Sequence, residues 1–401
     1  MKYDFDELVE RRGTNCVKWD EKAPILQEGK FTDDMIPLWV ADMDFRVAPA
    51  IQKALQQRVA HGVFGYNIVP ESYYEAVISW FCRRHQWEIQ RQWILYTTAV
   101  VPAMSCVIKA LSIPGERQRV GEPEGSGMKV LILSPAYNCF FSSIRNNGCE
   151  VLESPLKAVD DSFEVDFNDF EAKCADEKTT LFLLCNPHNP SGRVWTREEL
   201  QRMYDICHQH GVKVVSDEIH CELIMPGHQF VPFGTITDEC VVMNSPSKNF
   251  NTAGLQIANI ISPHPSWRRR IDRAININEV CDVNPFGIVA LQAAYNESED
   301  WIDELNQYLW GNYEVLRDFI AENLPQWKVC RLEGTYLPWV DISAMGITSQ
   351  ELCDRLLAEA KVWVNPGTMY GPQTGEGYIR FNIATQRSRL VEALERIKSV
   401  Q

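Results

Sequence analysis

The chain has 401 residues, 45% of them hydrophobic and 23% charged, which is typical of a globular protein with a large buried core. The formal net charge of −15 argues against nucleic acid or an anionic membrane as the main partner, although an acidic surface can still contain a local basic pocket. The N-terminus is charged and the most apolar runs are only strand-sized, so we expect no signal peptide, no membrane span and a cytoplasmic location.

The thirteen cysteines are scattered through apolar segments, without a CxxC pair or a tight Cys/His cluster in the sequence. In a chain of this length the pattern indicates reduced, mostly structural thiols, which agrees with a cytoplasmic setting. We therefore expect no metal site.

Between about residue 70 and residue 260, helical patterns alternate with short apolar runs. In chain order the predicted elements are helix Ser72–Arg84, helix Val101–Leu111, a surface loop Pro114–Gly127, strand Lys129–Ser134, helix Asn138–Asn147, strand Glu150–Ser154, helix Phe167–Cys174, strand Thr180–Cys185, helix Thr196–His210, strand Lys213–Ser216 and strand Cys240–Asn244. The strand segments are continuously apolar, as expected for strands covered on both faces. This alternation predicts an α/β fold with a mostly parallel sheet between helices.

The C-terminal part has a different pattern. Its predicted elements are a long helix or bent pair Glu297–Asn323, strands Trp327–Cys330 and Tyr336–Asp341, helix Ser349–Glu359, strands Val362–Val364 and Tyr378–Ile383, and helix Ser388–Val400. This mixture predicts a smaller α+β domain. We place the large domain at residues 46–284 and the small domain at residues 1–45 together with 285–401.

Three polar motifs follow predicted strands directly, at Asn186–Gly192, Ser216–His220 and Ser245–Asn251. Each has an ordinary structural explanation when taken alone: Asn-Pro pairs form turns, a strand-end Asp caps a helix, and a Lys is solvated at the surface. However, ligands of open α/β sheets bind beyond the carboxyl ends of the strands. The order of the three motifs therefore favours one shared binding site.

Together these motifs resemble those of the fold-type I pyridoxal-phosphate (PLP) enzymes, the aspartate aminotransferase superfamily, from about Ile36 to the C-terminus. The resemblance implies PLP as the cofactor and a seven-stranded, mostly parallel sheet in the large domain. It implies that Lys248, in Ser-x-Ser-Lys-x-Phe-Asn, forms a Schiff base with PLP, and that Asp217 pairs with the pyridine nitrogen. It also implies that Asn189 donates to the phenolic oxygen and that Arg380, in Gly-Tyr-Ile-Arg-Phe-Asn, binds the α-carboxylate of an amino-acid substrate.

The chemistry of these four side chains agrees with the roles that the resemblance implies. A buried carboxylate such as Asp217 raises the pKa of a pyridine nitrogen beside it and keeps the nitrogen protonated. A desolvated Lys248 has a partly neutral amine that can act as nucleophile and base. The planar guanidinium of Arg380 matches a carboxylate with two parallel hydrogen bonds, and its apolar sequence surroundings require a partner for a buried charge.

The phosphate of PLP requires a group of donors, and the resemblance places it at the start of the second predicted helix. Backbone N–H groups at Ala99 and Val100 would receive the dianion there, although the family usually has glycine in place of Ala99. Ser245 and Ser247 resemble phosphate-binding hydroxyls. Many relatives have an arginine where this chain has Gln256, so the phosphate charge would be balanced less directly.

Three further residues acquire a possible role only through the resemblance. Tyr137 is similar to the aromatic residue that stacks on the cofactor ring, although core packing would also explain it. His220 stands where aminotransferases commonly have a tyrosine that points at the phenolic oxygen. Tyr66, in Phe-Gly-Tyr-Asn, resembles the tyrosine that reaches the cofactor and substrate site of the neighbouring subunit, which implies a homodimer with shared sites.

A closer resemblance, to the cystathionine β-lyase and cysteine-S-conjugate β-lyase branch, is carried by Trp39–Phe45, Phe64–Asn67, Asp217–His220 and Glu333–Asp341. It implies cleavage of cystathionine or related cysteine conjugates to a thiol, pyruvate and ammonia, with Lys248 as the base at Cα. The segments 31–37 and 370–372 are candidates for selecting the substrate side chain.

Two alternatives remain open from the sequence. The first is an aminotransferase of class I or II, because the same fold supports several reactions. The second is a PLP-binding regulatory protein that acts through protein–protein contact, since no DNA-binding helix pair and no basic patch is visible in the sequence.

Overall fold

The computed structural model describes residues 2–20, 34–113 and 127–400. The predicted surface loop, except for Gly127, and the first three residues of the candidate substrate segment 31–37 lie outside these ranges. None of the helices in the described ranges is long and apolar enough to cross a membrane.

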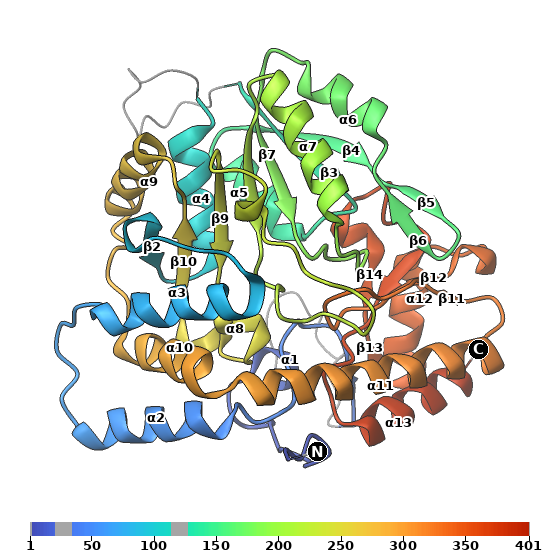
Figure 1. The fold of residues 1–401 in the computed structure, drawn as a ribbon. Helices are drawn as coiled ribbons and strands as arrows, with labels where there is room; N and C mark the ends of the chain where they lie inside the picture. Colours follow the sequence, from blue (N-terminus) through green and yellow to red (C-terminus); the bar gives the residue numbers. More distant parts are fainter. Residues whose placement is uncertain (1, 21–33, 114–126, 401) are drawn as a thin grey trace.

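A seven-stranded sheet forms the centre of the molecule (Figure 1). Its strands lie in the order β2 (Ile94–Thr97), β10 (Ala258–Ile261), β9 (Cys240–Asn244), β8 (Lys213–Asp217), β7 (Thr179–Cys185), β3 (Lys129–Ser134) and β4 (Glu150–Pro155). Neighbouring strands from β9 to β4 are parallel, whereas β10 runs antiparallel to both β2 and β9. The expectation of a mostly parallel seven-stranded sheet is confirmed.

Alternate side chains of the central strands enter two separate hydrophobic clusters, one on each face of the sheet. On β7, Phe182 and Leu184 belong to one cluster, and Leu181 and Leu183 belong to the other. The helices of this part are α2 (Pro49–His61), α3 (Glu71–His85), α4 (Val100–Leu111), α5 (Asn138–Asn146), α6 (Phe167–Cys174), α7 (Arg197–Gln209), α8 (Pro246–Asn249) and α9 (Pro265–Ile277). Since both faces are covered, the continuous apolar runs of these strands are explained.

The C-terminal part contains two consecutive helices and a second sheet. Helices α10 (Pro285–Glu297) and α11 (Glu299–Asn323) are separated only by Ser298. The second sheet has the order β11 (Lys328–Val329), β12 (Trp339–Asp341), β15 (Tyr378–Arg380) and β14 (Asn365–Pro366). The remaining helices are α12 (Ser349–Arg355) and α13 (Arg387–Lys398), and α12 continues as a π-helix over Leu356–Ala360. The bent helix pair was expected to begin at Glu297, but its first helix begins at Pro285, a residue suited to a first helical turn.

The N-terminal segment packs with the C-terminal part. Strand β1 (Ile36–Pro37) pairs in parallel with β13 (Val362–Trp363), and the indole rings of Trp39 and Trp363 are stacked with centroids 3.9 Å apart. A short helix α1 (Val17–Asp20) precedes β1, and a hairpin β5 (Lys157–Val159) and β6 (Ser162–Glu164) extends from β4. We propose the division into residues 46–284 and residues 1–45 with 285–401, which this pairing supports.

Several predicted bounds were wrong for identifiable reasons. The strand predicted from Tyr336 begins only at Trp339, because Pro338 has no N–H group to donate to a ladder. The strand predicted to end at Ile383 ends at Arg380, since the next residues turn toward the N-terminal segment and Asn382 N donates to Leu38 O at 2.8 Å. Helix α2, strand β10 and helix α9 were not predicted.

Candidate active site

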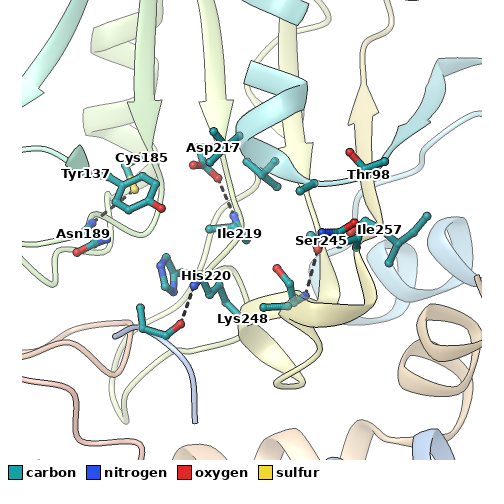
Figure 2. Close-up of a pocket in the computed structure, with 17 residues that line it drawn as sticks. Thr98, Tyr137, Cys185, Asn189, Asp217, Ile219, His220, Ser245, Lys248 and Ile257 are labelled. Carbon is teal, nitrogen blue, oxygen red and sulfur yellow. Dashed lines mark hydrogen bonds between the residues drawn. The ribbon is translucent and has the colours of Figure 1, made fainter. Parts of the chain in front are cut away.

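A pocket lies beyond the carboxyl ends of β7 and β8, between the start of α4 and the turn that carries Lys248 (Figure 2). Its lining consists of Ala41, Thr98, Ala99, Val100, Val101, Tyr137, Cys185, Asn189, Asp217, Ile219, His220, Ser245, Ser247, Lys248, Ala253, Gln256 and Ile257. The structure thus brings together nine of the eleven candidate site residues. Of the other two, Arg380 adjoins the pocket through Asn189, and Tyr66 lies elsewhere.

Lys248 projects from the one-turn helix α8, whose first turn is capped by Ser245: the Ser247 N–H donates to Ser245 Oγ at 3.1 Å. The Lys248 ammonium donates to the backbone carbonyl of Ala41 at 2.6 Å. Loss of hydration lowers the pKa of Lys248 to about 8, with Arg380 acting in the same direction and the carboxylates of Asp42 and Asp217 opposing it. A useful fraction of the amine is therefore neutral near physiological pH.

Asp217 is the last residue of β8, and its side chain is buried at the floor of the pocket. Its Oδ1 accepts a hydrogen bond from the Ile219 N–H at 3.1 Å. Burial raises the pKa of Asp217 to about 7, while that backbone bond and the charge of Lys248 oppose the rise. A cationic group placed against Asp217 would therefore hold it ionised and be held protonated in return.

Arg380, on β15, is buried with 3% of its surface exposed. Its Nη1 donates to Asn189 Oδ1 at 3.1 Å, its Nη2 donates to Trp39 O at 2.9 Å, and its guanidinium carbon lies 4.6 Å from the centre of the Tyr370 ring. Its Nε is buried and donates to no acceptor among residues 2–20, 34–113 and 127–400. Within the same ranges no carboxylate pairs with Arg380, so the guanidinium is available to an anionic ligand.

Asn189 follows β7 in the first of the three polar motifs and is buried. Because its Oδ1 accepts from Arg380, its amide N–H₂ group remains as the donor that faces the pocket. His188 and Asn186 shape this loop: His188 Nδ1 lies 2.7 Å from Ser191 Oγ, and Asn186 Nδ2 donates to Val231 O at 3.0 Å.

The start of α4 presents unpaired backbone donors to the pocket. Ala99 is the residue before the helix, and among the described residues no side chain caps the first turn, so the N–H groups of Val100 and Val101 have no side-chain acceptor there. The φ of Ala99 is −163°, an extended value open to any residue, so glycine is not required there. A phosphate dianion matches these donors and the positive end of the helix.

The polar groups beside this helix start differ from the sequence expectation in one respect. Ser245 lines the pocket, but its hydroxyl donates to Ile257 O at 2.7 Å while it caps α8. Its hydroxyl proton is therefore already used, and Thr98, Ser247 and Gln256 are further residues with polar side chains that line the pocket. Lys248 is the sole cationic side chain among the lining residues, so backbone N–H groups would have to supply most of the donors to a bound phosphate.

His220 and Tyr137 complete the walls of the pocket (Figure 2). Burial, followed by the charges of Lys248 and Arg380, holds the pKa of His220 well below its usual value, so the imidazole is neutral. Its Nδ1 is buried without a hydrogen-bond partner in the described part of the chain. Burial also raises the pKa of Tyr137 well above its usual value, so this ring is a neutral phenol.

Tyr336 is a site residue that the sequence interpretation missed. It is fully buried, and its hydroxyl donates at 2.9 Å to Ala41 O, the same carbonyl that accepts from Lys248. The ring of Tyr336 also makes an edge contact with His220, with centroids 6.1 Å apart. The sequence interpretation assigned Tyr336 to a strand. The one sequence signal against that assignment was Pro338, which prevents the strand from starting before Trp339.

Tyr66 lies in the connection between α2 and α3 and is fully exposed. Its neighbours Val63, Phe64 and Ile68 are also exposed, by 64%, 54% and 85%. Tyr66 does not line the pocket of its own chain.

Comparisons with known proteins identify the family of this chain. Residues 33–397 match the family model of aminotransferase class I and II, and the chain belongs to that family. It is 38% identical to cystathionine beta-lyase PatB of Bacillus subtilis over 99% of both chains. Two solved structures are similar. Cystalysin of Treponema denticola, which contains pyridoxal 5'-phosphate, has a TM-score of 0.92 and 32% identity, and the match covers 100% of this chain and 99% of that chain. The PLP-bound C–S lyase of Staphylococcus hominis has a TM-score of 0.88 and 30% identity, and the match covers 99% of this chain and 98% of that chain.

Proposed function

We propose that this chain is a PLP-dependent carbon–sulfur β-lyase that cleaves cystathionine or a related cysteine S-conjugate to a thiol, pyruvate and ammonia. The observation that carries the proposal is that Lys248 and Asp217 line one pocket, while Arg380, which has no carboxylate partner among the described residues, adjoins that pocket through Asn189. The similarity to a cystathionine beta-lyase along almost the whole chain supports elimination rather than another reaction of the family.

Pyridoxal phosphate is the cofactor, and the residues present fit it. Asp217 would hold the protonated ring nitrogen, Asn189 would donate to the phenolic oxygen, and Tyr137 would stack on the ring. Val100, Val101 and Ser247 would bind the phosphate. Two buried polar atoms that have no hydrogen-bond partner within residues 2–20, 34–113 and 127–400, Arg380 Nε and His220 Nδ1, agree with a site built to receive additional polar groups.

When bound, PLP supplies an electron-withdrawing ring that makes the Cα proton of the substrate acidic. Arg380 binds the substrate α-carboxylate with parallel hydrogen bonds and so fixes the orientation of the Cα–H bond. Asp217 would hold a proton on the ring nitrogen. Lys248 Nζ would remove the Cα proton, and its lowered pKa of about 8 makes it a suitable base.

Loss of the sulfur group completes the reaction. The Cβ–S bond breaks with its electron pair leaving on sulfur, which takes up a proton to become the thiol. The remaining fragment takes up one water molecule and yields pyruvate and ammonia. The Ala41 carbonyl, which accepts from both Lys248 and Tyr336, provides a fixed position for Lys248 Nζ between these transfers.

We also propose that the active form is a homodimer in which Tyr66 enters the site of the other subunit. An exposed tyrosine among three exposed apolar neighbours is unusual on a monomer surface and typical of an interface. A cytoplasmic location is proposed as well, because all thirteen cysteines of the chain are unpaired thiols, even Cys174 and Cys207, whose sulfurs lie 4.0 Å apart.

The test is a product assay with the purified, PLP-loaded protein. With cystathionine or an S-alkyl cysteine, we expect equal amounts of pyruvate, ammonia and free thiol. A second assay supplies an amino acid with a 2-oxo acid and measures amino-group exchange. Exchange without pyruvate would identify an aminotransferase, and inactivity in both assays would favour the regulatory alternative.

A further inference from the structure

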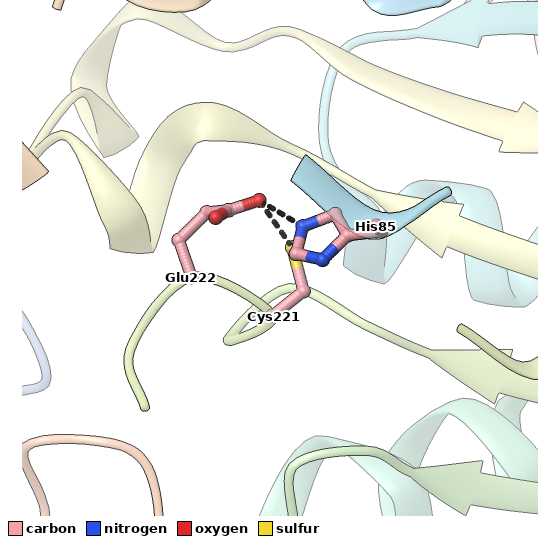
Figure 3. Close-up of side chains that lie close together, drawn as sticks. All are labelled: His85, Cys221 and Glu222. Atoms are coloured by element: carbon pink, nitrogen blue, oxygen red, sulfur yellow. Dashed lines mark hydrogen bonds and ion pairs between the residues drawn. The ribbon is translucent and has the colours of Figure 1, made fainter. Parts of the chain in front are cut away.

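His85, Cys221 and Glu222 form a buried cluster outside the PLP pocket (Figure 3). His85 is the last residue of α3, whereas Cys221 and Glu222 belong to the turn after β8, immediately beyond His220. Their potential ligand atoms all lie within 4.8 Å of one another. The side chains of His85 and Glu222 are 8% and 1% exposed, and Cys221 is fully buried.

We propose that this cluster is a zinc site, with His85 Nε2, Cys221 Sγ and a carboxylate oxygen of Glu222 as protein ligands. A nitrogen, a sulfur and an oxygen donor form a set that Zn²⁺ accepts, and tetrahedral coordination with three protein ligands leaves one position open. This proposal is independent of the β-lyase proposal, since none of the three side chains lines the PLP pocket.

The distances require only small movements. Cys221 Sγ lies 3.6 Å from Glu222 Oε1, and His85 Nε2 lies 2.6 Å from the same oxygen. A tetrahedral ion with bonds of about 2.0–2.3 Å separates its ligand atoms by about 3.3–3.7 Å, so shifts of about 1 Å would suffice. Trp80 Nε1 donates to Glu222 Oε1 at 2.7 Å and would orient the carboxylate as an outer hydrogen-bond donor.

A second observation points to a missing ligand. Glu222 Oε2 is buried and accepts no hydrogen bond in the described part of the chain, although Arg84 Nε lies 3.4 Å away. A surface pocket bounded by His85, Cys221 and Glu222 reaches the cluster from outside. Water can therefore supply the fourth ligand, and the ion has a route of entry.

The local charge also favours a cation. Arg84 forms ion pairs with Glu222 and Glu299, each with a nitrogen–oxygen distance of 3.4 Å, and with Asp303 at 2.9 Å. Arg83 forms a further ion pair with Glu299 at 3.5 Å. Three carboxylates thus face two guanidinium groups, which leaves one negative charge in excess. Zn²⁺ together with a Cys221 thiolate would add one positive charge and neutralise the group.

Zinc binds a cysteine as its thiolate, so Cys221 would lose its proton to the solvent when the ion binds. Two amides already point at the sulfur: Asn244 Nδ2 donates at 3.5 Å and Asn249 Nδ2 at 3.6 Å. These donors would stabilise a thiolate.

The experiment uses the PLP-loaded protein after treatment with a chelator and dialysis. Calorimetric titration with Zn²⁺ should give one ion per chain, and Co²⁺ should produce a thiolate-to-metal charge-transfer band with tetrahedral d–d absorption. The variants Cys221→Ser and His85→Gln should each bind Zn²⁺ at least about tenfold more weakly, since even outer-sphere changes cost about 10–100-fold. Cys353→Ser, which removes another buried thiol in α12, should bind as the unsubstituted protein does.

Absence of the charge-transfer band from the unsubstituted protein would overturn the proposal, and this result does not depend on whether any variant folds. Zinc binding that survives both Cys221→Ser and His85→Gln would be adventitious and would overturn it as well. Neither result would affect the pyruvate and thiol assay, so failure of the zinc site and failure of the proposed lyase activity are distinguishable.

Discussion

Arg380 Nη1 donates a hydrogen bond of 3.1 Å to Asn189 Oδ1, across 191 residues of sequence. This bond joins the C-terminal sheet to the loop after β7 and connects the two halves of the proposed active site. It fixes the amide of Asn189 so that its N–H₂ group faces the pocket, and it holds the guanidinium in one orientation. In the proposed site, cofactor orientation and substrate binding would therefore be coupled.

The substitution Arg380→Lys should raise KM for the sulfur substrate and lower kcat/KM by about 10–100-fold, because an ammonium cannot make two parallel hydrogen bonds to a carboxylate. Steady-state kinetics of pyruvate release measure the effect. Arg387→Lys is the matched control: Arg387 is also hydrogen-bonded, but to Asn312 on α11. Equal losses in the two variants would contradict the role of Arg380.

The substitution Asp217→Asn should lower kcat by about 10²–10³-fold, the usual cost of removing one well-placed electrostatic group from an active site. The neighbouring Glu218 provides the control. Burial raises the pKa of Glu218 to about 8, so it is largely neutral at pH 7, and its Oε1 accepts from Phe233 N at 2.8 Å. Glu218→Gln should therefore change kcat little, and a loss as large as that of Asp217→Asn would count against the assignment.

The contribution of Asp217 to the stability of the PLP-free protein should fall as pH rises from about 4 to 7. The pKa of Asp217 is raised from 3.8 in the unfolded chain to about 7 in the folded one, so the folded state binds more protons in this window. The stability that protonated Asp217 contributes is fully present below pH 3.8, the pKa in the unfolded chain. It is lost as pH rises through about 7, the pKa in the folded chain, and its magnitude is about a few kcal/mol. Urea unfolding at pH 5 and pH 7 should show a smaller difference for Asp217→Asn than for the unsubstituted protein. An unchanged difference would contradict the raised pKa.

Mixing two variants that each lack one residue of a shared site should restore activity if Tyr66 serves the other subunit. Lys248→Ala and Tyr66→Phe chains, refolded together in equal amounts, form hybrid dimers in which one of the two sites contains both native residues. Statistical mixing then predicts about a quarter of the activity of the unsubstituted enzyme. Activity no greater than the sum of the separate variants would argue against a shared site.

The sequence was most informative where local patterns were strong. Strands β3 and β9 and helix α6 have the predicted bounds, because continuous apolar runs and clear caps define them. Residues at strand ends, such as Asp217 and Asn189, were brought together as expected, since parallel strands deliver their carboxyl ends to one edge.

Contacts set by tertiary packing could not be predicted in the same way. The backbone carbonyl of Ala41 accepts hydrogen bonds from Lys248 and Tyr336. No sequence pattern indicates which backbone carbonyl will accept a hydrogen bond from a distant side chain. His85 reaches Glu222 across 137 residues, so a search for short Cys/His spacings could not find the proposed zinc cluster. The engaged hydroxyl of Ser245 likewise depends on the position of Ile257.

The central claim is that Lys248 binds PLP covalently, and the most direct measurement is mass spectrometry of the peptides from holoprotein reduced with borohydride. We expect a pyridoxyl-phosphate adduct on Lys248 alone, and loss of both the adduct and the visible absorbance in Lys248→Ala. Lys213→Ala, which removes another lysine whose pKa is lowered by burial, should retain both. An adduct on a different lysine, or unchanged visible absorbance in Lys248→Ala, would contradict the claim.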